Sequence, residues 1–205
     1  SGIPDFRSVD GLYHQKFKYP PETMLSHTFY ETHTAEFFDF YRQKLIVHGA
    51  RPNAAHLRLA ALEREGKCRA VVTQNIDGLH QAAGSKTVYE LHGSTLRNYC
   101  TRCGKFFPVQ FIEDAAGVGD GVPRCDECGG IVKPDVVLYE EGLDEETMEN
   151  AVHAIRGADT LIVGGTSLAV YPAAGLLRYF RGENLVVINK QPTPADAMAN
   201  LLIHA

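Results

Sequence analysis

Four of the five cysteines of this chain fall into two close pairs, and this spacing constrains the fold more than any other feature of the sequence. The pairs are Cys100-x-x-Cys103 and Cys125-x-x-Cys128, with 21 residues between them. Each pair presents two thiolates to one side of an ion, and zinc takes four thiolates in a tetrahedron at about 2.3 Å. We therefore predict a structural zinc site with no open position. Two disulfides are the alternative, although they are typical of small secreted domains.

Outside the cysteine-rich stretch, helical patterns alternate with short apolar runs. In the first helix, Asn53 is the expected N-cap, and Ala54, Leu57 and Ala61 share one face. Wholly apolar strands between helices are typical of parallel strands that are covered on both faces. The sequence therefore predicts an α/β fold with a parallel sheet. The predicted helices span residues 53–66, 144–156 and 172–181, and the predicted strands span residues 69–73, 160–164 and 185–189.

Two further features predict buried positions. Residues 34–47 are rich in aromatic side chains, with Phe37, Tyr41 and Leu45 one helical turn apart, so we expect an amphipathic helix whose apolar face is part of a core. The fifth cysteine, Cys68, directly precedes a predicted strand. We expect it to be a small buried apolar residue.

Composition and charge exclude several classes of function. The chain has 205 residues, with 20 Lys and Arg against 25 Asp and Glu, so its net charge is -5. A negative chain without a basic segment argues against nucleic-acid binding. No apolar run reaches the roughly 18 residues of a membrane-spanning helix. Because the chain begins at Ser1 without a signal peptide and ends within an apolar run, we expect both ends to lie inside a longer protein.

Polar residues follow three of the predicted strands. Ligands of parallel sheets bind beyond the carboxyl ends of the strands, so these residues are candidates for a binding site. Each group alone has the ordinary composition of a loop, but the three together favour a nucleotide site. The groups are Gln74-Asn75-Ile76-Asp77, Gly164-Gly165-Thr166-Ser167 and Asn189-Lys190.

His92 is the candidate general base. It follows an apolar segment, residues 87–91, and stands directly before the zinc module, for which we expect little helix over residues 98–132. A histidine with a pKa of about 6.5 suits proton abstraction near neutral pH. The alternative is an ordinary surface or packed histidine, since the chain has nine.

Several distinctive motifs occur in one order from the first residue to the last. They are Ser1-Gly-Ile-Pro-Asp-Phe-Arg7, Thr73-Gln-Asn-Ile-Asp-Gly-Leu-His80, Leu91-His-Gly93, the two C-x-x-C pairs, Lys133-Pro-Asp-Val-Val-Leu-Tyr-Glu-Glu141, Gly165-Thr-Ser-Leu-Ala-Val-Tyr-Pro172 and Val187-Ile-Asn189. In these motifs and their order the chain resembles the sirtuins, and the bacterial-type sirtuins most of all.

The resemblance implies a Rossmann-like parallel sheet domain that holds NAD, with an inserted small domain made of a zinc ribbon and a helical module. The NAD-binding domain would comprise residues 1–10, 48–97 and 133–205. The cofactor loop and helical module would span residues 11–47, and the zinc ribbon residues 98–132. The family's first strand and its Gly-Ala-Gly phosphate loop would precede Ser1. Acyl-lysine peptide would lie in the cleft between the domains.

The activity implied by the resemblance is NAD-dependent removal of an acetyl group from a protein lysine, which gives nicotinamide, free lysine and O-acetyl-ADP-ribose. His92 would take a proton from a ribose hydroxyl, while Asn75 and Asp77 would orient the ribose and the nicotinamide amide. The implied cofactor-binding residues are Phe6, Arg7, Gln74, Asn75, Ile76, Asp77, His92, Gly165, Thr166, Ser167, Asn189 and Lys190.

The resemblance also implies where the acetyl-lysine peptide binds. The family often has Phe-Gly where this chain has Tyr139-Glu140, which bears on the shape of the acyl-lysine tunnel and on the charge beside it. Relatives that remove acidic acyl groups carry Tyr and Arg where this chain has Phe38 and Tyr41, so we expect an uncharged acyl group such as acetyl. The peptide would add as a strand, recognised mostly through its main chain, at Val137, Leu138, Tyr139 and Glu140, with Val170 at the same site.

Two other functions remain open from the sequence. One is a zinc-ribbon module on a nucleotide-binding scaffold that reads acyl-lysine without catalysis. The other is an NAD-dependent ADP-ribosyltransferase. Replacing His92 separates a binder from a deacylase, because only the deacylase needs a base. Reduced thiols for a metal, together with the NAD pool, predict a cytoplasmic protein.

Overall fold

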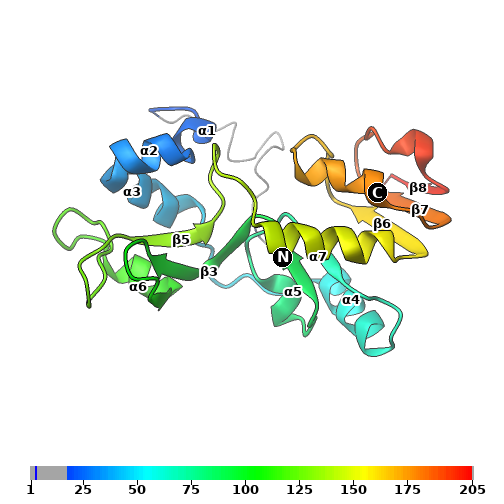
Figure 1. The fold of residues 1–205 in the computed structure, drawn as a ribbon, viewed down its shortest axis with the longest axis horizontal. Helices are drawn as coiled ribbons and strands as arrows, with labels where there is room; N and C mark the ends of the chain where they lie inside the picture. The colour runs from blue at the N-terminus through cyan, green and yellow to red at the C-terminus, as the bar shows by residue number, and fades with distance from the viewer. Residues whose placement is uncertain (1–2, 4–17, 205) are drawn as a thin grey trace.

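The structure is a computed structural model that describes residue 3 and residues 18–204, and it forms two lobes along its longest axis (Figure 1). We call them the ribbon lobe (residues 18–47 and 93–140) and the parallel lobe (residues 54–92 and 141–204). Phe6 and Arg7, both implied in cofactor binding, lie outside the described residues. No helix within residues 18–204 combines the length and the apolar character needed to cross a lipid bilayer.

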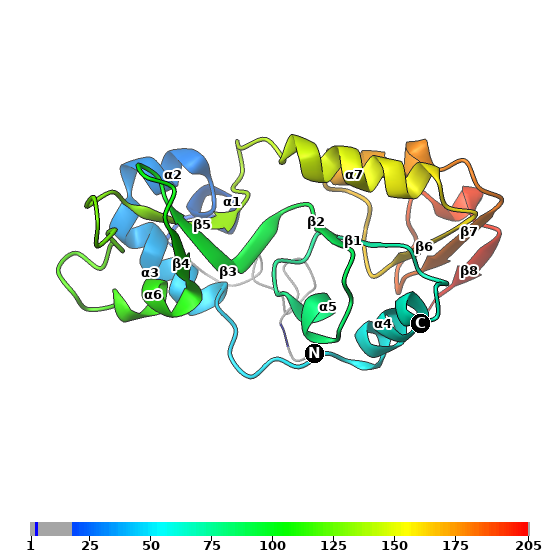
Figure 2. The same ribbon diagram turned by 60° about the horizontal axis from the view of Figure 1, so that its bottom comes forward.

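The ribbon lobe packs short helices against an antiparallel sheet with the strand order β4-β3-β5 (Figure 2). Its core is one cluster, in which Phe37, Phe38 and Tyr41 are fully buried beside Ile112 and Val132. The predicted aromatic core face is therefore confirmed. The elements are α1 (Pro21–Met24), α2 (His27–Thr32), α3 (Thr34–Lys44), β3 (Gly93–Cys100), β4 (Phe106–Pro108), α6 (Val109–Asp114) and β5 (Val132–Val136).

The parallel lobe contains two separate parallel ladders, β1-β2 and β6-β7-β8. The predicted parallel pairing is confirmed. Within residues 18–204 the strands are not covered on both faces, because residues of β6 alternate between half-buried and exposed and all of β8 is exposed. The elements are α4 (Ala54–Arg64), β1 (Val71–Thr73), α5 (Leu79–Ala82), β2 (Val88–Glu90), α7 (Glu145–Arg156), β6 (Thr160–Gly164), η2 (Ala173–Tyr179), β7 (Asn184–Ile188), η3 (Asp196–Met198) and β8 (Leu201–Ile203).

Helix α4 begins as predicted but buries a different face. The side chain of Asn53 accepts hydrogen bonds from the first-turn amides of Ala55 and His56, which makes it the N-cap. The residues that α4 buries are His56 and Ala60, whereas Leu57 is 53% exposed. The physical reason is a tertiary contact, since the His56 ring packs against His80 of α5 with 4.6 Å between ring centres.

Three other predictions needed correction. Residues 173–179 form a 3₁₀ helix, because a glycine lies in the segment and the amide of Gly175 donates to the carbonyl of Pro172 three residues earlier. The zinc module contains a short helix, α6, where we expected little helix. Cys68 is only half-buried, with its Sγ 3.5 Å from the carbonyl oxygen of Ala70.

Candidate active site

The four paired cysteines converge on one point of the ribbon lobe. Their Sγ atoms all lie within 4.8 Å of one another. The Sγ atoms of Cys100 and Cys128 are 3.3 Å apart, and those of Cys103 and Cys125 are 3.7 Å apart. A Cβ at Gly130 would lie 2.9 Å from the Sγ of Cys100, so glycine is needed for this close approach. Four sulfur atoms at this spacing fit a tetrahedral zinc ion, as the sequence predicts.

His92 lies between β2 and β3, where the chain passes from the parallel lobe into the ribbon lobe. Its Nδ1 is 3.0 Å from the carbonyl oxygen of Gln74, and because a carbonyl only accepts, Nδ1 is the donor. The neutral ring then keeps Nε2 as a proton acceptor. Burial lowers the pKa of His92, while the hydrogen bond to Gln74 opposes this effect. The ring is therefore neutral near pH 7 and oriented to take up a proton at Nε2.

Gly93 fixes the place at which His92 leaves the parallel lobe. Its φ is +73°, a conformation that favours glycine, and a Cβ there would overlap the carbonyl oxygen of Asp135 on β5. Directly after His92 the chain is therefore tied to the antiparallel sheet. Val137 strengthens this tie, since its amide donates to the carbonyl of His92 over 3.1 Å.

The loop that follows β1 is held from both lobes. Nε2 of Gln74 donates to Oγ1 of Thr166 over 3.4 Å, which joins this loop to the one after β6. The carbonyl of Ile76 accepts from both the amide and the hydroxyl of Thr95 on β3, at 3.0 and 3.2 Å. Oδ1 of Asp77 accepts a hydrogen bond from the amide of Leu79 over 2.9 Å, at the first residue of α5. Asn75 is left exposed at the tip of the loop.

The loops after β6 and β7 are neighbours. The amide of Gly165 donates to the carbonyl of Ile188 over 3.0 Å, and the hydroxyl of Thr166 accepts from the amide of Leu168 over 3.2 Å. Asn189 follows β7, and its side chain donates to the carbonyl of Gln191. Through Thr166, the chain of contacts runs from β7 to Gln74 and on to His92. Three predicted polar groups therefore adjoin one another, with Ser167 and Lys190 exposed among them.

The segment of residues 137–140 leaves β5 beside α1 and α2 and then turns toward α7 (Figure 1). The amide of Tyr139 donates to the carbonyl of Leu25 over 3.0 Å, and its carbonyl accepts from the amide of His27 over 2.9 Å. Leu138 is buried, whereas Tyr139 and Glu140 are exposed. The segment is thus attached at Tyr139, through an isolated β-bridge, to the chain at the start of α2. Val170, the remaining predicted substrate residue, is half-buried after β6.

Glu141 organises this segment, although sequence reasoning gave it no role. Its Oε2 accepts from the amide of Leu138 over 2.8 Å and from Nζ of Lys133 over 3.1 Å, and its Oε1 is 2.8 Å from Nδ1 of His27. One carboxylate therefore joins β5, the segment and α2. Glu141 lies in the motif from Lys133 to Glu141, so the motif could have pointed to it. No local pattern, however, distinguishes Glu141 from the adjacent Glu140.

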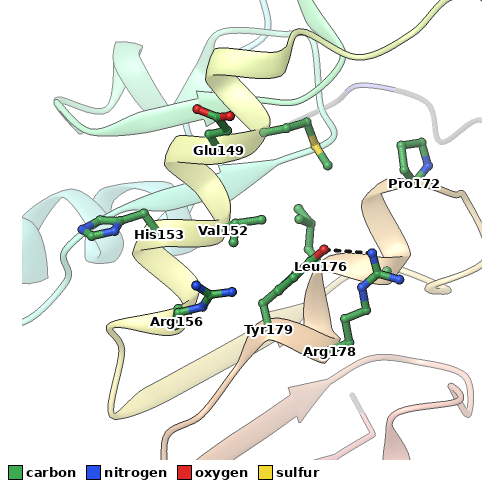
Figure 3. A pocket seen from close by; sticks show the side chains of 10 residues that line it. Glu149, Val152, His153, Arg156, Pro172, Leu176, Arg178 and Tyr179 are labelled. Carbon is green, nitrogen blue, oxygen red and sulfur yellow. Dashed lines mark hydrogen bonds between the residues drawn. The ribbon is translucent and has the colours of Figure 1, made fainter.

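A separate cavity of about 450 Å³ lies between α7 and η2 (Figure 3). None of its lining residues is a predicted site residue. The guanidinium groups of Arg156 and Arg178 lie 5.7 and 4.9 Å from the centre of the Tyr179 ring. Arg178 also donates to the Tyr179 hydroxyl over 2.8 Å (Figure 3). This cavity is distinct from the loops around His92.

Known proteins match both the sequence and the fold. The model of the Sir2 family matches residues 1–172. An NAD-dependent protein deacetylase of Clostridium acetobutylicum is 62% identical over 205 residues, which cover 99% of this chain and 82% of that relative. A solved structure of Sir2 with a p53 peptide and NAD+ has a TM-score of 0.86 at 39% identity, covering 100% of this chain and 82% of that one. Sir2 bound to acetylated peptide gives 0.85 at 38% identity, covering 93% and 81%.

Proposed function

The chain belongs to the Sir2 family, and from this premise we propose that it is an NAD-dependent protein-lysine deacetylase that releases nicotinamide, free lysine and O-acetyl-ADP-ribose. The match extends over 99% of the chain at 62% identity, and similar solved structures contain NAD+ or acetylated peptide. Acetyl-lysine proteins are its substrates. The observation that carries the proposal is the geometry of His92.

His92 acts as the general base. Since Nδ1 is committed to the carbonyl of Gln74, the proton is taken up at Nε2. Burial keeps the ring neutral, and a neutral imidazole is the form that accepts a proton. The same hydrogen bond sets the orientation of the ring from the loop that carries Asn75 and Asp77. These two polar side chains, which we assign to the catalytic site, orient the ribose and the nicotinamide amide.

The adjoining loops after β1, β6 and β7 hold NAD. When bound, NAD would supply the ribose carbon that the acetyl oxygen attacks, nicotinamide as the leaving group and the ribose hydroxyl that finally carries the acetyl group. The contacts from Gln74 through Thr166 to Gly165 fit this role, because they place main-chain amides and side-chain oxygens at the carboxyl ends of three parallel strands. We assign Gln74, Asn75, Ile76, Asp77, His92, Gly165, Thr166, Ser167, Asn189 and Lys190 to cofactor binding, with Phe6 and Arg7 from outside the described residues.

Residues 137–140 and Val170 bind the peptide as an added strand. The segment lies directly after β5, and the amide of Val137 ties it to His92. The zinc ion is structural and orders the lobe that carries this segment. The acyl group is uncharged, because Phe38 and Tyr41 are both buried and neither is a cation that pairs with a carboxylate.

The domain boundaries and the cellular location complete the proposal. We assign residues 1–10, 48–97 and 133–205 to the Rossmann-like NAD-binding domain, residues 11–47 to the cofactor loop and helical module, and residues 98–132 to the zinc ribbon. These bounds differ from the two lobes, because residues 93–97 and 133–140 pack within the ribbon lobe. The protein works in the cytoplasm, where thiols are reduced and NAD is abundant.

The deciding experiment incubates an acetyl-lysine peptide with the protein, with and without NAD, and follows the peptide by mass spectrometry. We expect loss of the acetyl group only with NAD. His92→Ala should abolish turnover while the circular dichroism spectrum is kept, and the matched variant His153→Ala, on the exposed face of α7, should turn over normally. Turnover by His92→Ala at the wild-type rate would contradict the proposal. Transfer of ADP-ribose to a protein side chain, without deacetylation, would identify the alternative enzyme.

A further inference from the structure

Glu140 has an unusual backbone conformation. Its φ is +77°, and Leu168 is the other residue besides glycine with a positive φ in the described part of the chain. This region of φ disfavours L side chains, and a residue is held there only when its surroundings fix it. The positive φ of Glu140 therefore calls for contacts that hold the residue in place, and its side chain makes them.

The side chain of Glu140 is fixed by α2. Its Oε2 accepts from the amide of Thr28 over 2.9 Å and from the Thr28 hydroxyl over 2.7 Å. These hydrogen bonds lower the pKa of Glu140, so the carboxylate is charged at neutral pH. Both donors are neutral, and the residue is exposed. The result is a negative charge held in one place at the surface.

The neighbouring carboxylates differ from Glu140 in having cationic partners. Glu141 pairs with Lys133 and with His27, and Glu31 lies 3.3 Å from the other nitrogen of His27. No Lys, Arg or His within residues 18–204 forms an ion pair with Glu140. The exposed Tyr139 directly precedes Glu140, and its main chain forms an isolated β-bridge with Ser26 at the start of α2. Among the described residues Glu140 is thus the carboxylate at the end of residues 137–140 that has no ion-pair partner, although the nearby His27 contributes to the lowering of its pKa.

We propose that Glu140 determines substrate specificity by pairing with a Lys or Arg side chain next to the acetyl-lysine of the substrate peptide. The inference rests on the proposed function, which places the peptide along residues 137–140. An anchored carboxylate loses little side-chain entropy on pairing, so it discriminates better than a mobile one. The alternative is a structural one, in which Glu140 only joins the segment to α2.

The test compares acetyl-lysine peptides that differ only in the residues flanking the acetyl-lysine, which are Lys or Arg in one set, Gln in a second and Glu in a third. Wild-type kcat/KM should be about 2- to 5-fold higher with basic than with neutral flanks, the size expected for an exposed ion pair. It should be lower still with acidic flanks. High salt should reduce the preference.

Glu140→Gln separates the two roles. The amide oxygen of glutamine still accepts from Thr28, so a structural role would leave the ratio of basic to neutral peptides unchanged. Loss of charge recognition would bring that ratio to about 1, whatever the absolute rates. Glu183→Gln removes the same charge from an exposed loop of the parallel lobe and should keep the wild-type ratio. An equal ratio in wild type and Glu140→Gln, or no preference in wild type, would overturn the proposal.

Binding keeps this test independent of turnover. Fluorescence anisotropy of the same labelled peptides measures Kd for wild type, Glu140→Gln and Glu183→Gln without any reaction. If no peptide is deacetylated, the proposed function fails, and the ratio of Kd values still decides the role of Glu140. If the peptides are deacetylated without regard to flanking charge, the proposed function stands and the specificity inference fails.

Discussion

The two lobes differ in the continuity of their buried apolar cores. In the ribbon lobe, Phe37, Phe38 and Tyr41 have no exposed surface and belong to one continuous cluster. In the parallel lobe the buried residues divide into two small clusters. The strands of both lobes expose some large apolar side chains: Leu96 and Phe106 in the ribbon lobe are 50% and 52% exposed, and Ile162 and Leu201 in the parallel lobe are 53% and 52% exposed. The difference lies in the continuity of the core. The ribbon lobe is therefore the more self-sufficient of the two.

The difference follows from how each kind of sheet is built. The antiparallel strands of the ribbon lobe need cover on one face, and α3 supplies it from the same lobe. A cluster of four thiols adds a cross-link that does not depend on buried area. Parallel strands need cover on both faces. In β6, the residues that point to one face are half-buried, and those that point to the other face are exposed. The proposed active site depends on both lobes, because His92 stands where they join.

The largest expected effect tests whether the ribbon lobe depends on its metal. Zinc removal by a chelator, or Cys125→Ser, should unfold this lobe, since structural zinc contributes about 10 kcal/mol or more to the folding of small modules. Hydrogen exchange followed by mass spectrometry should show protection lost in β3–β5 and kept in β6 and β7. Cys68→Ser, outside the cluster, should bind zinc as the wild type does. Equal loss of protection in both lobes would contradict the comparison.

The next effect compares one apolar side chain from each lobe. Phe37 contacts the rings of Tyr30 and Phe38, with ring centres 5.2 and 5.3 Å apart, so Phe37→Ala should lower the free energy of unfolding by about 3–5 kcal/mol. Ile162→Ala removes a side chain that is half in solvent and should cost less than about 1 kcal/mol. Urea denaturation of the two variants measures both. A larger loss for Ile162→Ala would reverse our ranking of the lobes.

A third substitution acts at the junction of the lobes. Gly93→Ala forces a side chain into a backbone conformation that costs about 1–3 kcal/mol and places a Cβ against the carbonyl of Asp135. We expect reduced stability and, because His92 is adjacent, a larger fall in deacetylation rate than stability alone explains. Gly49→Ala is the matched control, since Gly49 has a similar φ of +70° and open space around it. Equal activity losses in the two variants would show that the junction has no special role.

The smallest effect is the pH dependence of the contact between His27 and Glu141. The hydrogen bond with Glu141 raises the pKa of His27 above 6.5. The contribution of His27 to folding stability is therefore full below pH 6.5 and is lost as the pH rises through the raised pKa. Burial raises the pKa of Glu141, but its hydrogen bonds outweigh this and hold it below 4.5, so its contribution is lost as the pH falls. The contact should be strongest between pH 4.5 and 6.5.

Titration of the His27 ring by NMR measures this contact. Glu141→Gln should move the His27 pKa back toward 6.5. Glu183→Gln, in the parallel lobe, should leave it unchanged. A wild-type His27 pKa at or below 6.5 would show that the contact between α2 and residues 137–141 is weaker than the structure indicates.

Much of the local structure could be predicted from neighbouring residues alone. The side chain of Asn53 caps α4 by accepting from amides two and three residues away, and that of Asp144 caps α7 by accepting from the amide three residues away. The C-x-x-C spacing predicts the thiol cluster, because each turn fixes two ligands regardless of the rest of the fold. The aromatic spacing of α3 predicts its buried face, and the motifs identify the family.

Features that depend on contacts between residues far apart in the chain were decided by the tertiary structure alone. The buried face of α4 follows from the contact of His56 with His80, and the anchoring of Glu140 follows from Thr28, which is 112 residues away. The sequence pattern of a helix or a loop carries no information about such partners. The family, and with it the activity, could therefore be predicted from the order of the motifs. Which ring nitrogen of His92 can accept a proton, and where the charge of Glu140 is held, depend on contacts between distant residues. Local periodicity cannot encode such contacts.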